Sequence, residues 1–139
     1  MENIIENNKL IAQFMGGKLN DELSFLIAQN DIFIPYHGVI RLDTVETGKG
    51  PVIKYHKSWD WLMPVVEKIE NIDFGNWEPI KGDVYMNCSF EIEITSSVCQ
   101  LNIHADQRCY KSFFYVCSNS KIESVYGLII EFIKWYNNL

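Results

Sequence analysis

The sequence predicts an α+β fold in a single domain that covers residues 1–139. Its length fits one domain, and an apolar fraction of 47% is enough to bury a core. Apolar and polar residues alternate across residues 83–117, which predicts an antiparallel meander sheet. Helical periodicity in residues 58–71 and 120–137 predicts two helices that pack on one face of this sheet.

A short N-terminal helix is expected over residues 3–15. Ile11 and Phe14 fall on one face of this segment, as core-facing residues of a helix do. Gly16 and Gly17 follow directly, and glycine is the residue that most easily adopts the left-handed conformation at a helix end.

Short strands are expected within residues 22–42, and they could extend the main sheet. Apolar residues alternate along 22–28, which is typical of a half-buried strand. The run 32–34 leads into Pro35, which cannot donate to a strand ladder, so this run is expected to be an edge strand or a loop entrance. Residues 39–42 predict one more short strand.

The stretch 54–70 is the least ordinary part of the sequence, with two tryptophans, a proline and an amphipathic helix. Ser58 is a favourable N-cap, and Asp60 in the first turn complements the helix dipole. Pro64 removes one backbone hydrogen bond and crowds the preceding turn. We therefore expect either a kink near residues 60–63 or a first turn that is not fully α-helical.

Residues 73–82 contain two glycines and a proline and are expected to form a connector. The next segment, 83–94, is the clearest strand of the sequence, with apolar residues at six alternate positions that should share one face. These six residues are Val84, Met86, Cys88, Phe90, Ile92 and Ile94.

Joining the apolar faces of strands 83–94 and 98–105 fixes their expected register. That register points Cys88 and Cys99 to the core and His104 to the opposite face, which argues against a Cys–His dyad. Cys99, His104 and Cys109 give three zinc-type ligands on alternating faces, where a structural site needs four. No metal and no cofactor is expected, since phosphate-loop, dinucleotide and metalloprotease motifs are also absent from the sequence.

Residues 109–117 are apolar on both faces of the expected strand, so this strand is covered on both sides or lies at an interface between copies of the chain. The following helix, 120–137, begins with Ser120 and Glu123, which have the spacing of a capping box.

The formal net charge of −6 and the pI of about 5.0 argue against nucleic acid or anionic membranes as partners, since both attract positively charged proteins. No apolar run approaches the roughly 20 residues that cross a bilayer, and the first residues lack the pattern of a signal peptide. We expect a cytoplasmic protein with reduced cysteines.

Two candidate surfaces emerge from these assignments. His56 and Asp60 could pair, but no nucleophile is placed beside them. Glu91 and Glu93 could flank a substrate on one face of a strand, although a solvated sheet face explains them equally well. The candidate interaction surface comprises Tyr55, His56, Trp59, Asp60, Trp61 and Trp77, and the candidate polar face comprises Asn87, Glu91, Glu93 and His104.

Three segments together resemble a family of short uncharacterised proteins that are encoded in gut bacterial and phage genomes. They are residues 7–16 (NNKLIAQFMG), residues 55–70 (YHKSWDWLMPVVEKIE) and the helix of 120–137, in 121–126 (KIESVY) and 131–136 (EFIKWY). The resemblance implies a prophage or mobile-element setting, and it implies no activity, cofactor or catalytic residue.

The sequence therefore favours a non-enzymatic interaction or accessory module that acts through its aromatic surface. The alternative is a small-molecule-binding domain or weak hydrolase that uses the polar face Asn87, Glu91, Glu93 and His104. A third possibility is a homo-oligomer in which strand 109–117 is the interface.

Overall fold

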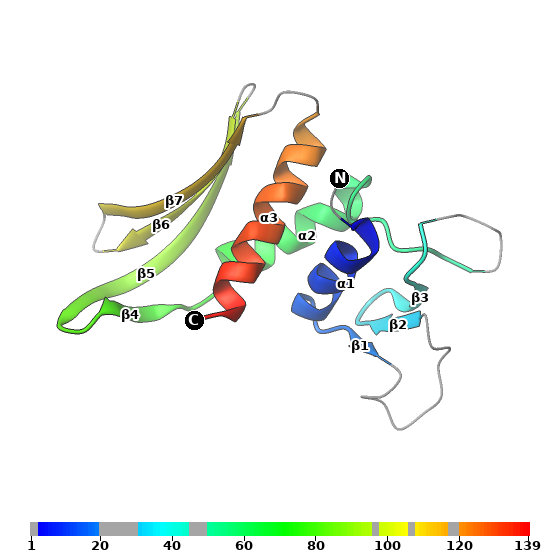
Figure 1. Cartoon of the computed structure of the whole chain (residues 1–139), viewed down its shortest axis with the longest axis horizontal. Coiled ribbons are helices and arrows are strands. Elements are labelled where there is room, and N and C mark those ends of the chain that lie inside the picture. Colours follow the sequence, from blue (N-terminus) through cyan, green and yellow to red (C-terminus); the bar gives the residue numbers. More distant parts are fainter. Residues whose placement is uncertain (1–2, 20–30, 45–49, 96–97, 106–107, 117–119) are drawn as a thin grey trace.

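In the residues that it describes, the computed structural model has three helices between two antiparallel sheets (Figure 1). The backbone is described for residues 3–19, 31–44, 50–95, 98–105, 108–116 and 120–139. Within these ranges, the side chains of 79, 80, 83, 108–111 and 114–116 are not described. The predicted strand at 22–28 lies outside the described residues, and so do most of the side chains of the predicted two-faced strand 109–117.

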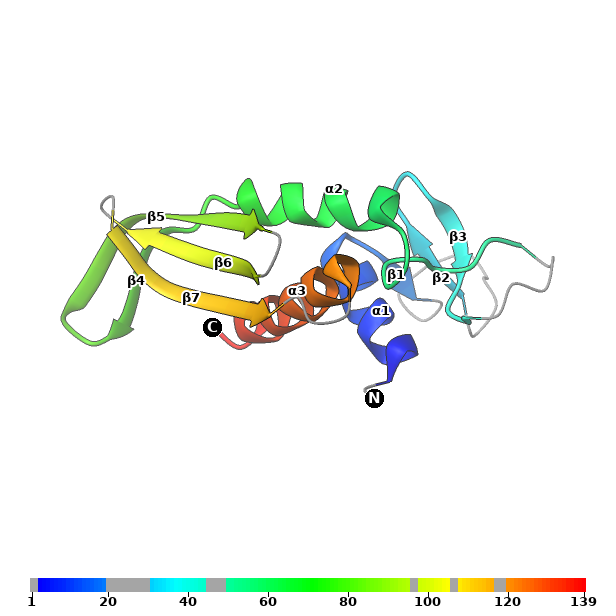
Figure 2. The ribbon, with the colours of Figure 1, turned by 90° about the horizontal axis from the view of Figure 1, so that it is seen from above.

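The larger sheet is a four-stranded meander that confirms the α+β prediction. Figure 2 shows helices α2 (Trp59–Glu70) and α3 (Lys121–Asn137) running along this sheet, with α2 beside β5 and α3 beside β6 and β7. The strands, in sheet order, are β4 (Gly75–Ile80), β5 (Asp83–Ile94), β6 (Val98–Ala105) and β7 (Arg108–Val116).

The register between β5 and β6 is the predicted one. Phe90 lies opposite Ile103, and Ile92 lies opposite Leu101, so the apolar faces of the two strands coincide. Cys99 is fully buried on this face, as expected of a small apolar residue.

Two predictions for this sheet are wrong. Residues 73–82 contain strand β4 rather than a connector, and Val84 and Met86 are each 49% exposed instead of facing the core. The cause is a bulge, because β5 has one more residue than β4 between the pairs Gly75–Cys88 and Trp77–Tyr85. Asn87 adopts a φ of 56° at this bulge. The extra residue shifts the alternation by one, so the apolar face of β5 changes side at Asn87.

Helix α2 contains Pro64 and begins with a tight first turn. The backbone nitrogens of both Trp61 and Leu62 donate to the carbonyl of Ser58, at 3.2 and 3.0 Å, so the turn has mixed 3₁₀ and α character. Ser58 occupies the predicted N-cap position, but its side chain makes no capping hydrogen bond. The buried stripe of α2 is the predicted one and consists of Leu62, Val65, Val66 and Ile69.

The described strands near the N-terminus do not extend the main sheet, which the sequence had left open for residues 22–42. They form a separate three-stranded sheet on the other side of α1 (Ile4–Phe14), as Figure 1 shows. Its strands are β1 (Lys18–Leu19), β2 (Asp31–Ile34) and β3 (Gly38–Arg41).

The ends of the helices have identifiable caps. The side chain of Asn3 accepts hydrogen bonds from the first turn of α1. Nζ of Lys68 in α2 donates to the carbonyl of Phe14 and lies 4.6 Å from the centroid of the Phe14 ring. The positive charge of Lys68 therefore lies at the negative end of the dipole of α1. Ser120 accepts a hydrogen bond from the backbone nitrogen of Glu123 at 3.2 Å, which confirms the predicted cap of α3.

Gly17 permits a close approach between α1 and β2. A Cβ atom at this position would lie 2.7 Å from the carbonyl oxygen of Ala12 and 2.9 Å from Cδ1 of Ile32. Neither neighbour can retreat easily, since Ala12 belongs to a helix and Ile32 is fully buried.

We therefore expect Gly17→Ala to destabilise the fold by about 1–3 kcal/mol, the usual effect of overpacking. Urea unfolding measures this change. Gln13→Ala is the matched control, because Gln13 is exposed on α1, the helix that Gly17 approaches, and its effect should stay within about 0.5 kcal/mol. Equal unfolding midpoints for Gly17→Ala and the natural chain would disprove the close approach.

Candidate functional site

The residues of the predicted aromatic surface separate into three places. Tyr55 is only 1% exposed, so the prediction that it contributes to an exposed surface is wrong. Trp77 lies in β4 and packs edge-on against Trp135 of α3 at 5.4 Å between ring centroids, remote from the start of α2. Trp59 is 38% exposed, whereas Trp61 is partly buried, so Trp59 is the outward ring of this pair.

Trp61 is held by a histidine that the sequence analysis did not select. The ring of His37 stacks on Trp61 with 4.0 Å between centroids and 16° between planes. The ring of Tyr55, which is buried, meets the ring of Trp61 edge-on, with 5.1 Å between the centroids. This stack attaches the turn between β2 and β3 to the first turn of α2. Desolvation by burial lowers the pKa of His37.

Tyr36 is the most unusual residue of this turn. The backbone nitrogen of His37 donates to the carbonyl of Ile34 at 3.0 Å, and Tyr36 has a φ of 72°. With Pro35 before it, Tyr36 occupies the position of a type II turn that normally requires glycine. Its relative exposure is 107%, so its ring gains nothing from burial.

We use the name hairpin–helix surface for the residues of this turn and of the start of α2. Most of its α2 residues were selected from the sequence, but those of the turn were not. A sequence signal for the turn exists, because Pro35 and two consecutive aromatic rings, Tyr36 and His37, separate two short apolar runs. The hairpin–helix surface consists of Tyr36, His37, Trp59, Asp60, Trp61 and Met63.

His56 has a structural role rather than a place on this surface. Its Nδ1 accepts a hydrogen bond from the amide of Asn8 at 2.9 Å, and the hydroxyl of Tyr126 donates to the amide oxygen of Asn8 at 3.0 Å. Asn8 is fully buried, so both contacts satisfy groups that water cannot reach. The network joins α1, α3 and the segment before α2. Desolvation, with a smaller contribution from Lys57, lowers the pKa of His56.

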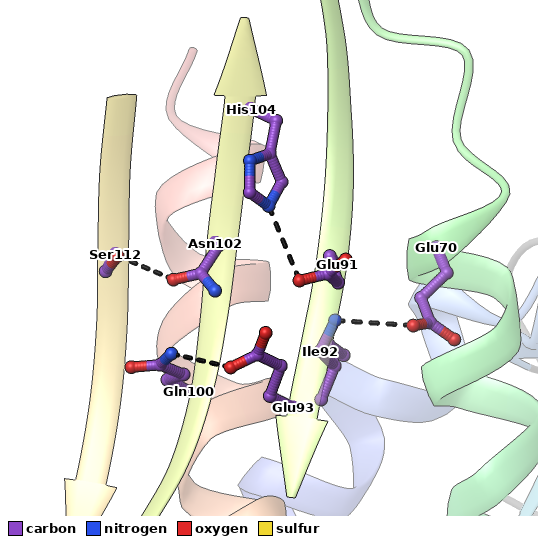
Figure 3. A network of polar contacts seen from close by, with 8 residues as sticks. All are labelled: Glu70, Glu91, Ile92, Glu93, Gln100, Asn102, His104 and Ser112. Carbon is purple, nitrogen blue, oxygen red and sulfur yellow. Dashed lines mark hydrogen bonds and ion pairs between the residues drawn. The ribbon is translucent and has the colours of Figure 1, made fainter. Parts of the chain in front are cut away.

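The polar face of the larger sheet brings together three of its four predicted residues (Figure 3). Nε2 of His104 lies 3.5 Å from Oε1 of Glu91, and Glu93 accepts a hydrogen bond from Gln100 at 2.8 Å. Asn87 is not in this row. Its backbone nitrogen binds the side chain of Asn76 at the bulge.

These polar groups mostly satisfy one another. The hydroxyl of Ser112 donates to Asn102 at 2.6 Å, so it is not placed as a nucleophile beside His104. Nε2 of His104 is buried and has no hydrogen-bond partner among the described residues. Glu70 of α2 is also drawn in Figure 3, and it accepts a hydrogen bond from the backbone nitrogen of Ile92, which covers the edge of β5 beyond β4.

Two further properties concern metals and membranes. Among the side chains that the structure describes, no group of three or more His, Cys, Asp and Glu residues could hold a metal ion. Within the same part of the chain, no helix is long and apolar enough to span a bilayer.

Comparison of the chain with protein-family models, with curated proteins and with solved structures finds no match in any of the three.

Two tyrosines, the buried Tyr55 and the partly buried Tyr126, should respond in opposite ways to loss of the hydroxyl. The hydroxyl of Tyr55 is buried without a hydrogen-bond partner among the described residues, so Tyr55→Phe should leave stability unchanged or raise it. Tyr126→Phe removes a partner of buried Asn8 and should cost about 1–3 kcal/mol. Urea unfolding of this matched pair is the measurement. A larger loss for Tyr55→Phe than for Tyr126→Phe would contradict the assigned contacts.

The two perturbed histidines predict a pH-dependent stability. The pKa values of His37 and His56 are lowered from 6.5 in the fold, so the unfolded chain binds their protons first as the pH falls. Their contribution is complete above about pH 6.5 and is lost below it. Unfolding free energies measured from pH 7.5 to 5.5 should therefore decline, and His37→Gln and His56→Gln should each flatten the decline. A profile that neither substitution changes would contradict this assignment.

Proposed function

We propose that the protein is a non-enzymatic interaction module that binds a partner protein through the hairpin–helix surface. The observation that carries this proposal is Tyr36, a fully exposed ring in a backbone conformation that favours glycine. Residues held in such conformations cluster at functional sites, because the fold itself gains nothing from them. A tyrosine in this position therefore suggests a contact outside the chain.

The neighbours of Tyr36 suit a protein contact. Tryptophan and tyrosine are the residues most often found at the energetic centre of an interface. The stack of His37 on Trp61 holds the turn against α2, which limits the ordering cost when a partner binds. Met63, 38% exposed, adds a deformable apolar side chain one turn after Trp59.

The polar face supports the second candidate, a small-molecule-binding domain or weak hydrolase. The observation in its favour is Nε2 of His104, which is buried, has no hydrogen-bond partner among the residues that the structure describes and lies 3.5 Å from Glu91. The pairing of Glu93 with Gln100 and of Ser112 with Asn102 leaves fewer groups for a substrate. For this reason we rank it second.

The proposal also includes where the protein acts and which class of partner it binds. A net charge of −6 disfavours nucleic acid and anionic membranes as partners. We propose a cytoplasmic protein, encoded by a prophage or another mobile element, whose partner is a protein or a second copy of the chain.

Photo-crosslinking tests the proposal in the cells that make the protein. Benzoylphenylalanine in place of Trp59 should give a discrete adduct, whereas the same group in place of Glu93 on the polar face should not. Mass spectrometry identifies the adduct, and the purified partner should then bind the purified protein. An adduct with a second copy of the chain would identify self-association. No adduct at residue 59, or one only at residue 93, would disprove the proposed surface.

Tyr36→Gly separates binding from folding. Because glycine suits the turn, this substitution should not lower the free energy of unfolding, yet it should weaken binding of the crosslinked partner at least tenfold. Val39→Gly is the control, since Val39 is also exposed on this hairpin, and it should cost about 0.5–1 kcal/mol without affecting binding. Unchanged partner affinity in Tyr36→Gly would argue against a role for this ring.

A further inference from the structure

The exposed side of α2 carries acidic groups between its apolar ones. Successive residues of an α-helix are about 100° apart, so Trp59 and Trp61 leave the helix on nearly opposite sides of Asp60. Pro64 and Glu67 continue the strip of Asp60 along the axis, and all three are exposed. Asp60 and Glu67 are about 10 Å apart along the axis, at 1.5 Å per residue.

The nearby lysines leave this strip acidic. The ammonium group of Lys68 is turned to the carbonyl and ring of Phe14, on the side of α2 that faces α1. Lys57 precedes the helix, which begins at Trp59. Asp60 offsets the positive end of the helix dipole, which leaves Glu67 as the uncompensated charge of the third turn.

We infer that the partner of the hairpin–helix surface is a basic amphipathic helix. This inference rests on the proposed function and specifies its partner. Two basic residues seven positions apart on such a helix are also separated by about 10 Å, which matches the spacing from Asp60 to Glu67. An arginine near Asp60 can also lie over the exposed ring of Trp59, which adds a cation–π contact.

The remaining parts of the surface match the apolar stripe of that helix. Trp59 and Met63 are four residues apart and present adjacent apolar side chains along one side of the acidic strip. Tyr36 and His37 lie beside Trp61 on the other side. The net charge of −6 attracts a basic segment at a distance and repels an acidic one.

Two designed helical peptides of 18 residues test the inference. They share one apolar stripe and differ only at two positions seven residues apart, which are arginine in one peptide and glutamate in the other. Fluorescence anisotropy with labelled peptides at low salt measures binding to the whole protein. The arginine peptide should bind at least tenfold more tightly than the glutamate peptide, and added salt should weaken its binding.

Paired substitutions locate the charges that matter. Asp60→Asn with Glu67→Gln should weaken the arginine peptide about five- to tenfold, the effect expected of two exposed ion pairs. Asp73→Asn with Glu93→Gln changes the net charge equally at two other exposed sites and should leave affinity within twofold. Equal loss in both double variants would overturn the inference.

The outcomes for the inference and for the proposed function are distinguishable. If both peptides bind equally, or neither binds, the basic-helix inference is overturned. The crosslink at residue 59 and its dependence on Tyr36 still decide the proposed function, because they make no assumption about the charge of the partner. If the crosslink fails while the arginine peptide binds at Asp60 and Glu67, the proposed function is disproved. The surface then prefers basic peptides, but no partner in the cell uses it.

Discussion

The packing of Phe132 against four aromatic rings is the contact on which the rest of the fold depends. Phe132 is fully buried in α3, and its ring lies 5.1 Å from Phe90 of β5 and 6.4 Å from Phe14 of α1. One side chain thus joins the larger sheet to the helix that precedes the smaller one. Residues of both sheets and all three helices then belong to a single buried cluster. The position of α1 also determines where β2, β3 and the turn at Tyr36 lie relative to α2.

Most helices and strands of the larger sheet could be predicted because their apolar residues recur with the period of a helix or of a strand. The helix at 120–137, the register of β5 with β6 and the buried stripe of α2 were all predicted from apolar spacing alone, and all are confirmed. The separate smaller sheet was not predicted. Apolar strands such as β2 and β3 can pair with any strand that offers a matching face, so periodicity does not identify the sheet that they join.

The candidate site was harder to predict because it depends on contacts between distant parts of the chain. Trp59 and Asp60 were selected from local sequence, but His37 becomes relevant only when the turn stacks on Trp61. Tyr55 was misplaced because an aromatic residue beside polar ones has no local pattern that distinguishes core from surface. Sequence spacing correctly placed His104 and Glu91 on one face, since both positions follow from strand register.

The bulge at Asn87 lets Tyr85 and Cys88, which are three positions apart in β5, lie on the same side of the β4–β5 hairpin. Tyr85 and Trp77 lie opposite each other with rings 6.3 Å apart, while Val84 and Met86 are exposed. Because the bulge places Met86 and Asn87 of β5 opposite one residue of β4, loss of Asn87 would restore plain alternation and leave Tyr85 on the same side as Cys88. A deletion of three nucleotides would therefore straighten this hairpin and keep the same side chains inside. Length variation at this position changes how the strand bends and leaves its inner face unchanged.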